Sequence, residues 1–307
     1  NTLTLNERHQ VLLGADWYED RVNGSENFTE DSRWNQAAFI QHRYNADHFS
    51  TELGLRHDKN QQFGSENSWN AALTVPFNNA NDLILSYSEG FRAPTFNDLY
   101  YPDFCFGGFC SASANPDLEP ETSKSYEAQW RSRYSETGVL ELSLYRIDLQ
   151  DAIVLDQNFI PQNVQTARIN GFEAALKQEL YGWQGNLALA LIDPRDRDTG
   201  HTLARRAKRT LSLDLDRPFG EFAVGASWRA VSGRYDDAAN TRELGGYGLL
   251  SLRGKWQATE EVAFDLKLNN LFDKDYAEAT YSTSNGRFGY NTEGRTALFA
   301  VTWTPQL

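Results

Sequence analysis

The side chains that most often do chemistry are scattered through this sequence of 307 residues. None of the five histidines forms a pair with metal-ligand spacing on one strand face: His9, His42, His48, His57 and His201. Two acidic pairs, Asp236 with Asp237 and Asp193 with Asp196, fall in expected loops, where we expect solvated charge. The residues therefore predict no catalytic constellation and no metal site, and they favour a binding protein over an enzyme.

Two cysteines, Cys105 and Cys110, lie in a loop rich in glycine and phenylalanine. We predict a local disulfide, which would suit an oxidising compartment such as the periplasm or the cell surface. Closing so short a loop would stabilise it by only about 2 kcal/mol. Two free thiols are the alternative. A CxxC metal site is disfavoured because the spacing differs and no further His or Cys lies nearby.

The same loop is unusually aromatic for a solvated segment. Its large rings are Tyr100, Tyr101, Phe104, Phe106 and Phe109. Rigid aromatic side chains bind a large, partly apolar ligand at low entropic cost, so we predict that they contribute to a binding surface. The alternative, of equal weight, is that the loop packs its rings on itself around the two cysteines.

Alternating apolar and polar residues predict the elements that must position these loops. Leu211, Leu213 and Leu215 alternate with Ser212 and Asp214, and the same pattern occupies residues 262–268. Period two indicates a β-strand with one apolar and one wet face, and we count about fifteen such strands. Lengths of about nine to thirteen residues would cross a bilayer obliquely.

The expected connections alternate between short and long. Short turns are expected at residues 45–48, 78–82, 135–138, 181–184, 216–220 and 257–260. Long connections are expected at residues 24–33, 91–122, 156–165, 193–203, 234–245 and 273–294, with a shorter one at 59–65. Short turns at one end and long loops at the other are typical of outer-membrane β-barrels.

Energetics set which face of each strand meets lipid. A cation such as Lys267 at the midplane of the lipid face would cost about 2–4 kcal/mol. The apolar side chains Val262, Phe264 and Leu266 are therefore expected to face lipid, and the charges to face a wet lumen. Trp69, Tyr87, Trp130, Trp228, Trp256 and Trp303 are expected near strand ends, where they would suit an interfacial girdle.

Composition excludes other classes. The net charge of −13 argues against nucleic acid as a partner, because phosphate binding needs clustered Lys and Arg. No apolar run is long enough for a transmembrane helix. A soluble β-sandwich or propeller is the competing architecture, but its strands average about five to six residues. We therefore predict an all-β, transmembrane antiparallel β-barrel with short periplasmic turns and long extracellular loops.

An odd count of about fifteen strands does not suit a complete bacterial barrel, in which the number is even. The chain also starts abruptly inside the alternating pattern, at Thr2–Leu5. We therefore expect residues 1–307 to be the C-terminal part of a larger barrel domain, whose first strands and N-terminal plug are absent from this chain.

Three strand-to-loop junctions resemble the TonB-dependent outer-membrane transporter family. They are SYSEGFRAPTFNDLY at residues 86–100, NPDLEPET at 115–122 and NLFDKDY at 270–276. In each, Pro and Asn or Asp set the backbone angles at a strand end. Three further segments are most similar to vitamin B12 (cobalamin) transporting members: residues 56–64, 167–174 and 203–208.

The resemblance implies a barrel of 22 strands, of which these would be about the last 15, plugged by an N-terminal domain. It implies energy-coupled cobalamin transport across the bacterial outer membrane, with the TonB coupler engaged through the missing N-terminal part. Lipid and lipopolysaccharide would surround the barrel. Calcium could order the extracellular loops, with ligands upstream of this chain.

The resemblance also implies binding residues. Arg205 and Tyr290 match positions that line the corrinoid pocket, and Arg206 and Tyr235 are neighbours. A structural ion pair is the alternative for both arginines. Siderophore and haem receptors share much of the general pattern, so they are alternatives for the substrate. A passive porin-like barrel, a barrel enzyme and a soluble all-β binding protein are alternatives for the class.

Overall fold

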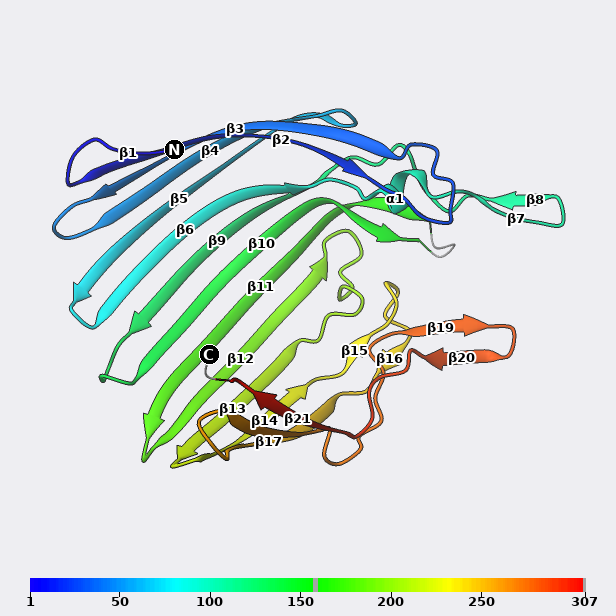
Figure 1. Cartoon of the computed structure of the whole chain (residues 1–307). Helices are drawn as coiled ribbons and strands as arrows, with labels where there is room; N and C mark the ends of the chain where they lie inside the picture. The colour runs from blue at the N-terminus through cyan, green and yellow to red at the C-terminus, as the bar shows by residue number, and fades with distance from the viewer. Residues whose placement is uncertain (157–159, 306–307) are drawn as a thin grey trace.

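The protein is built on one large antiparallel sheet, which is strongly curved (Figure 1). The computed structural model describes residues 1–156 and 160–305. Fifteen strands of this described part pair in the order in which they occur in the sequence, so the sheet is a continuous meander. They are β1 (Thr2–Thr4), β2 (His9–Arg21), β3 (Ser32–Asn45), β4 (Ser50–Asn60), β5 (Gly64–Asn78), β6 (Asn81–Arg92), β9 (Glu121–Ser132), β10 (Val139–Leu155), β11 (Pro161–Leu180), β12 (Trp183–Asp196), β13 (Arg209–Phe219), β14 (Phe222–Val231), β17 (Tyr247–Gln257), β18 (Val262–Asn269) and β21 (Thr296–Trp303).

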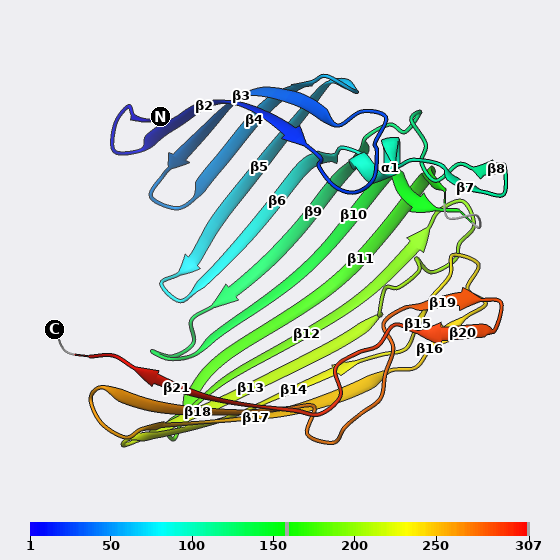
Figure 2. The same cartoon turned by 45° about the vertical axis from the view of Figure 1, so that its right-hand side comes forward.

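The remaining elements lie in the long connections. They are helix α1 (Phe96–Tyr100) and the hairpins β7 (Phe104–Phe106) with β8 (Phe109–Ser111), β15 (Arg234–Tyr235) with β16 (Glu243–Leu244), and β19 (Thr280–Thr283) with β20 (Gly286–Gly289). In both views these elements gather at one end of the sheet, which we call the long-loop end (Figure 2). No helix in the described residues has the length and hydrophobicity to span a bilayer.

The opposite end carries the short turns, and all six predicted short turns link neighbouring strands there. The turn between β11 and β12 shows the local reason. Tyr181 and Gly182 have φ angles of 52° and 76°, and positive φ at both central residues is the conformation whose twist matches a two-residue hairpin. The alternation of short and long connections is therefore confirmed.

One predicted long connection is wrong at its C-terminal end. A loop is expected at residues 156–165, but β11 begins at Pro161, so residues 161–165 are strand, and residues 157–159 lie outside the described part of the structure; β10 and β11 are 17 and 20 residues long. Pairing continues to Leu155 opposite Pro161. Polar side chains sustain it: Asn163 Nδ2 donates to the Asp151 carbonyl at 2.6 Å. A pair of strands outside the lipid needs no apolar face. The alternating apolar pattern therefore ends before the paired strands β10 and β11 do.

The strand register confirms that the apolar and the charged side chains of these strands lie on opposite faces of the sheet, as their alternation predicts. On the outward face Leu213 lies opposite Leu187 and Trp228, and the row continues to Leu250. On the inward face Arg131 pairs with Glu141 at 2.6 Å, across β9 and β10. Apolar side chains on the outer face and ion pairs on the inner face are typical of a membrane β-barrel.

Aromatic rings line both borders of the outward apolar band. Toward the long-loop end the Tyr87 ring centroid lies 4.4 Å from that of Trp69 and 5.0 Å from that of Tyr126. Toward the short turns the Trp256 ring stacks on Phe222 at 6.1 Å and on Phe264 at 5.3 Å. Such paired girdles mark the two membrane–water interfaces.

Candidate functional site

The long connection between β6 and β9, residues 93–120, covers the long-loop end of the strands near β3 and β11. Helix α1 begins with a capping box: Asp98 N donates to Thr95 Oγ1 at 3.2 Å, and Thr95 N donates to Asp98 Oδ2 at 2.8 Å. Both bonds satisfy backbone donors that the first helical turn leaves unpaired. The helix buries Leu99, whose side chain is 1% exposed.

Arg33 of β3 anchors the start of this connection. Its Nη1 donates to the Pro94 carbonyl at 2.7 Å, and its guanidinium carbon lies 4.9 Å from the Phe96 ring centroid. The connection also closes on itself, because Asn115 N donates to the Asp98 carbonyl at 2.7 Å. The segment is therefore held as a built structure.

Strand β11 anchors the other end of the connection. Glu119 N donates to Asn163 Oδ1 at 3.0 Å, and Asn163 Nδ2 donates to the Glu119 carbonyl at 3.0 Å. Asn115 Nδ2 donates to the Pro161 carbonyl at 3.1 Å. The extension of β11 beyond its predicted start supplies both anchoring contacts.

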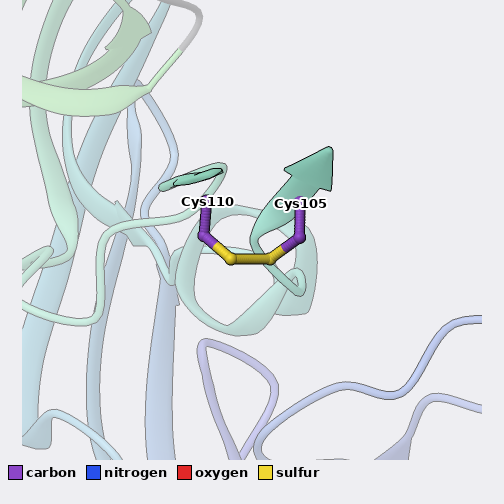
Figure 3. The surroundings of a disulfide bond; sticks show 2 residues. All are labelled: Cys105 and Cys110. Atoms are coloured by element: carbon purple, nitrogen blue, oxygen red, sulfur yellow. A yellow bond between two sulfur atoms is a disulfide. The ribbon is translucent and has the colours of Figure 1, made fainter. Parts of the chain in front are cut away.

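Between these anchors the hairpin β7–β8 projects from the molecule, and a disulfide joins Cys105 to Cys110 across it (Figure 3). The two cysteines lie directly opposite in the hairpin register, with Cα atoms 4.1 Å apart. Phe104 and Phe109 are 70% and 85% exposed. The disulfide thus braces a small platform on which the rings of Phe104 and Phe109 are largely exposed.

The five aromatic residues predicted in this loop are divided between two settings. Tyr100 is half-buried at the end of α1, and burial raises the pKa of its phenol. Tyr101 stands edge-on to Phe28, with ring centroids 5.7 Å apart. Phe104 and Phe109 lie on the projecting hairpin. The Phe106 backbone belongs to β7, and its side chain is outside the described part of the structure.

A second cluster joins three other connections. It consists of Arg205, Asp236 and Thr280, and we call it the three-loop junction. Arg205 Nε donates to Asp236 Oδ1 at 2.9 Å. The backbone N–H and the hydroxyl of Thr280 both donate to Asp236 Oδ2, the first at 3.2 Å. The Asp236 side chain is 1% exposed, whereas that of Arg205 is 50% exposed. One buried carboxylate therefore holds residues that are far apart in sequence.

Opposing effects act on the Asp236 carboxyl. Burial alone would raise its pKa, because it disfavours the charged form, but the hydrogen bonds from Thr280 and Arg205 and the charge of Arg205 outweigh burial. The net result is a lowered pKa, so the carboxylate is charged at neutral pH.

The backbone adds further ties between these connections. Arg205 has a φ of 57° and its N–H donates to the Tyr235 carbonyl at 2.6 Å. The Asn240 side chain bridges to Thr202: Thr202 N donates to Asn240 Oδ1, and Asn240 Nδ2 donates to the Thr202 carbonyl, both at 2.8 Å. Residues 197–208 and 232–246 are therefore bound together along their length.

Thr280 is the first residue of the hairpin β19–β20, and three exposed rings lie on this hairpin or directly after it. Tyr281 lies opposite Phe288, with ring centroids 5.9 Å apart, and its ring is 5.1 Å from that of Tyr290. The three side chains are 41%, 45% and 57% exposed, in the same order. They form an aromatic surface next to the three-loop junction.

The structure thus brings together the residues that resemblance singled out. Arg205 and Tyr235 meet at the three-loop junction, Arg206 is exposed beside them, and Tyr290 lies on the adjoining hairpin. The hairpins β7–β8 and β19–β20 project from the same end of the sheet in both views (Figure 1 and Figure 2).

Two expectations about acids are wrong. Asp236 is buried and not solvated, because it has three hydrogen-bond donors from two distant segments. Asp193 and Asp196 belong to the end of β12 and not to a loop. Thr280 carried no sequence signal. Asp236 could have been found by asking which acid could neutralise Arg205.

The described residues contain no group of three or more His, Cys, Asp or Glu side chains that could hold a metal ion. The three-loop junction and the hairpin β19–β20 offer exposed aromatic surface beside the half-exposed Arg205 guanidinium. Aromatic faces with a few fixed polar groups suit recognition of a large, partly apolar ligand.

The family model and the similar proteins agree on one family. The family model described as "TonB dependent receptor-like, beta-barrel" matches residues 1–271. The vitamin B12 transporter BtuB of Vibrio vulnificus is 30% identical over 302 residues, which is 95% of this chain and 47% of that protein. The vitamin B12 transporter BtuB of Photobacterium profundum is 30% identical over 281 residues, 88% of this chain and 44% of that protein. The chain spans about half the length of the curated relatives it matches.

Solved structures show the same fold. A mutant of the ferric enterobactin receptor PfeA from Pseudomonas aeruginosa superposes with a TM-score of 0.78 and 19% identity, over 98% of this chain and 52% of that one. The copper transporter OprC superposes with a TM-score of 0.80 and 18% identity, over 98% of this chain and 55% of that one. These similar proteins are transporters and receptors, not enzymes.

Proposed function

The chain belongs to the TonB-dependent receptor β-barrel family, and on that premise we propose that it serves the active uptake of cobalamin across the bacterial outer membrane. The family is one of outer-membrane receptors, so the long-loop end is the extracellular side. The observation that carries the substrate is the three-loop junction, which places Arg205 beside Tyr235 and next to the exposed rings of Tyr281 and Tyr290.

The chemistry of a corrinoid suits this surface. A corrinoid presents a broad, partly apolar face with amide groups at its rim, and aromatic rings cover such a face at little entropic cost. The half-exposed Arg205 guanidinium keeps donors available while Asp236 fixes its position. The two relatives that are vitamin B12 transporters support the same substrate.

We propose that residues 1–307 work as the C-terminal part of a barrel domain, with a plug and the contact to the TonB coupler supplied by the N-terminal part of the protein. Extracellular loops would capture the ligand, and the coupler would then rearrange the plug. Phe104 and Phe109, on the hairpin that the disulfide braces, would add further contacts at the long-loop end. Calcium would order the extracellular loops through ligands upstream of this chain.

Equilibrium binding tests the substrate. Full-length protein in detergent is titrated with cyanocobalamin, and in parallel with a ferric catecholate siderophore and with haem. Saturable binding of cobalamin alone is the expected result. Saturable binding of the siderophore or of haem, without cobalamin binding, would overturn the substrate and leave the receptor family intact.

A further inference from the structure

The segment NLFDKDY, residues 270–276, closes the base of the connection between β18 and β21. Asn270 is buried, and its Nδ2 donates to the Glu293 carbonyl at 3.2 Å. The backbone N–H of Arg295 donates to Asp273 Oδ1 at 2.7 Å. These side chains therefore join the first residues of the connection to its last residues, and the hairpin β19–β20 lies between the joined ends.

The last residue of this segment, Tyr276, packs against the large sheet. Its ring centroid lies 4.1 Å from that of Tyr247, the first residue of β17. The returning chain is tied to the same residue, because Thr292 Oγ1 donates to the Tyr276 carbonyl at 2.7 Å. Tyr276 thus connects the base of the connection to a strand of the sheet.

Tyr247 also holds a residue that follows the segment. Its side chain is buried, and its hydroxyl donates to Glu278 Oε1 at 2.7 Å. Beside it, Arg234 Nη2 of β15 donates to the Ala277 carbonyl at 3.2 Å, and the Arg234 guanidinium carbon lies 5.7 Å from the Tyr247 ring centroid. Residues 276–278 each have a partner on β15 or β17, and Tyr247 contacts two of them.

The exposed rings lie directly beyond these contacts. The hairpin β19–β20 begins at Thr280, two residues after Glu278, and Thr280 is itself held by Asp236. We call this hairpin, together with the following Tyr290, the aromatic arm. It projects from the long-loop end in both views (Figure 1 and Figure 2). A rotation at the base would displace Tyr281 and Tyr290 further than the base itself, because the arm extends away from it.

On the premise of the proposed function, in which the aromatic arm contacts the nutrient, we propose that Tyr247 is a positioning residue for ligand capture. Its side chain is too buried to present a surface to the ligand, and it acts by fixing the direction of the arm through Tyr276 and Glu278. An arm already held in its binding orientation does not have to be ordered when the ligand arrives, and that ordering would otherwise weaken binding.

Two measurements on full-length protein in detergent test this inference. A nitroxide label attached through Ser284→Cys, in the turn of the hairpin β19–β20, reports the mobility of the aromatic arm. The label does not react with Cys105 or Cys110, because these two residues form a disulfide. The dissociation rate of cyanocobalamin, followed by stopped-flow fluorescence, reports ligand capture.

Tyr247→Phe removes the hydrogen bond to Glu278 and keeps the ring that contacts Tyr276. We expect it to raise the mobility of the label and to speed cobalamin dissociation about fivefold, which corresponds to the loss of one hydrogen bond. Tyr145→Phe is the matched control, because the Tyr145 hydroxyl donates to Glu173 Oε1 at 3.0 Å between β10 and β11, away from the aromatic arm. The control should change neither quantity, and an unchanged label and rate in Y247F would overturn the proposal.

Substitutions of Glu278 test the same bond from its other partner. Glu278 is exposed, so Glu278→Ala tests the bond even if Tyr247→Phe fails to fold. It should reproduce the mobile label and the faster dissociation, whereas Glu278→Gln keeps an acceptor oxygen and should restore the behaviour of the unaltered protein. Equal behaviour of E278A and E278Q would overturn the proposal, since the hydrogen bond would then not be what holds the arm.

A multiple variant distinguishes positioning from a general loss of stability. Once Tyr281→Ala and Tyr290→Ala have removed rings from the aromatic arm, Tyr247→Phe should have little further effect on dissociation, because it acts through that surface. Full additivity of the effects would overturn the proposal. If the unaltered protein does not bind cobalamin, the proposed function fails and the label alone decides: equal mobility in Y247F and the unaltered protein would overturn the positioning role, and raised mobility would support it.

Discussion

Arg205 and Asp236 are joined by a 2.9 Å hydrogen bond between two extracellular connections, and the carboxylate at its centre is almost fully buried. A third connection reaches the same carboxylate through Thr280. Removing either charge would leave the other partner without its counterion, so the pair sets the geometry of the surface around it.

Replacing Arg205 tests the role of this pair in binding. Arg205→Ala should weaken cobalamin binding about tenfold, or ~1.4 kcal/mol, because it removes exposed donors and loosens the surface beside Tyr235. The measurement is a cobalamin titration by tryptophan fluorescence. Arg242→Ala is the matched control. Arg242 forms a comparable ion pair, with its Nε 3.7 Å from Asp237 Oδ1, but it lies outside the three-loop junction. Equal affinity of R205A and the unaltered protein would remove Arg205 from the binding site.

The lowered pKa of Asp236 predicts a pH dependence of the three-loop junction. In the unfolded chain an aspartate titrates near pKa of about 3.9. Because the pKa of Asp236 is lower in the folded protein, its ionised carboxylate contributes its full stabilisation above the unfolded pKa. This stabilisation is lost as pH falls through the folded pKa. The protection of the amide hydrogens in residues 273–294, measured as the exchange rate relative to the intrinsic rate at the same pH, should therefore fall below pH of about 4. Asp236→Asn should remove this dependence, and a dependence that persists in D236N would show that other groups control the junction.

Adjacent residues on β12 test which face meets lipid. Leu189→Arg should cost about 2–4 kcal/mol, since the outward row contains Ala174 and Leu211 and an arginine there would enter the hydrocarbon. Ala190→Arg should be tolerated, because it faces the lumen opposite Glu173. The temperature at which the folded band is lost on a semi-native gel compares the two variants. Equal losses would contradict the assigned faces.

Gly225 of β14 provides a packing test. Arg253 reaches across it to Asp216 on the inward face, and an added Cβ at Gly225 would overlap both side chains. Gly225→Ala should therefore destabilise the barrel by about 1–3 kcal/mol, as overpacking does. Gly254→Ala is the control, because the same modification meets open space there. Chemical denaturation in detergent measures both; equal stability of G225A and G254A would mean that the ion pair adapts without cost.

The disulfide braces a projecting hairpin and not the sheet. Cys105→Ser with Cys110→Ser should leave the melting temperature of the barrel unchanged, because the loop closed is short and worth about 2 kcal/mol within the hairpin. Ligand binding should weaken several-fold if Phe104 and Phe109 contribute contacts, since the platform that carries them becomes mobile. Ser111→Ala, in the same hairpin, is the control. A lower barrel melting temperature would show that the hairpin is part of the folded core.

Much of the architecture followed from local patterns. Alternation such as that of Leu211, Leu213 and Leu215 indicated strands and their outward faces, because a pleated strand turns every second side chain to the same side. Turns such as Tyr181–Gly182 were predicted because tight hairpins need particular backbone angles. Where no apolar face is needed, the pattern fails: residues 161–165 at the start of β11 are strand, although the sequence predicts a loop there.

Local residue patterns establish the all-β class, the order of short and long connections and the family, since each depends on residues close together in the chain. The burial of Asp236 between Arg205 and Thr280 follows only from the folded sheet. Burial and pairing between distant loops depend on which strands become neighbours and in which register. Those are properties of the assembled sheet, and no local pattern of residues encodes them.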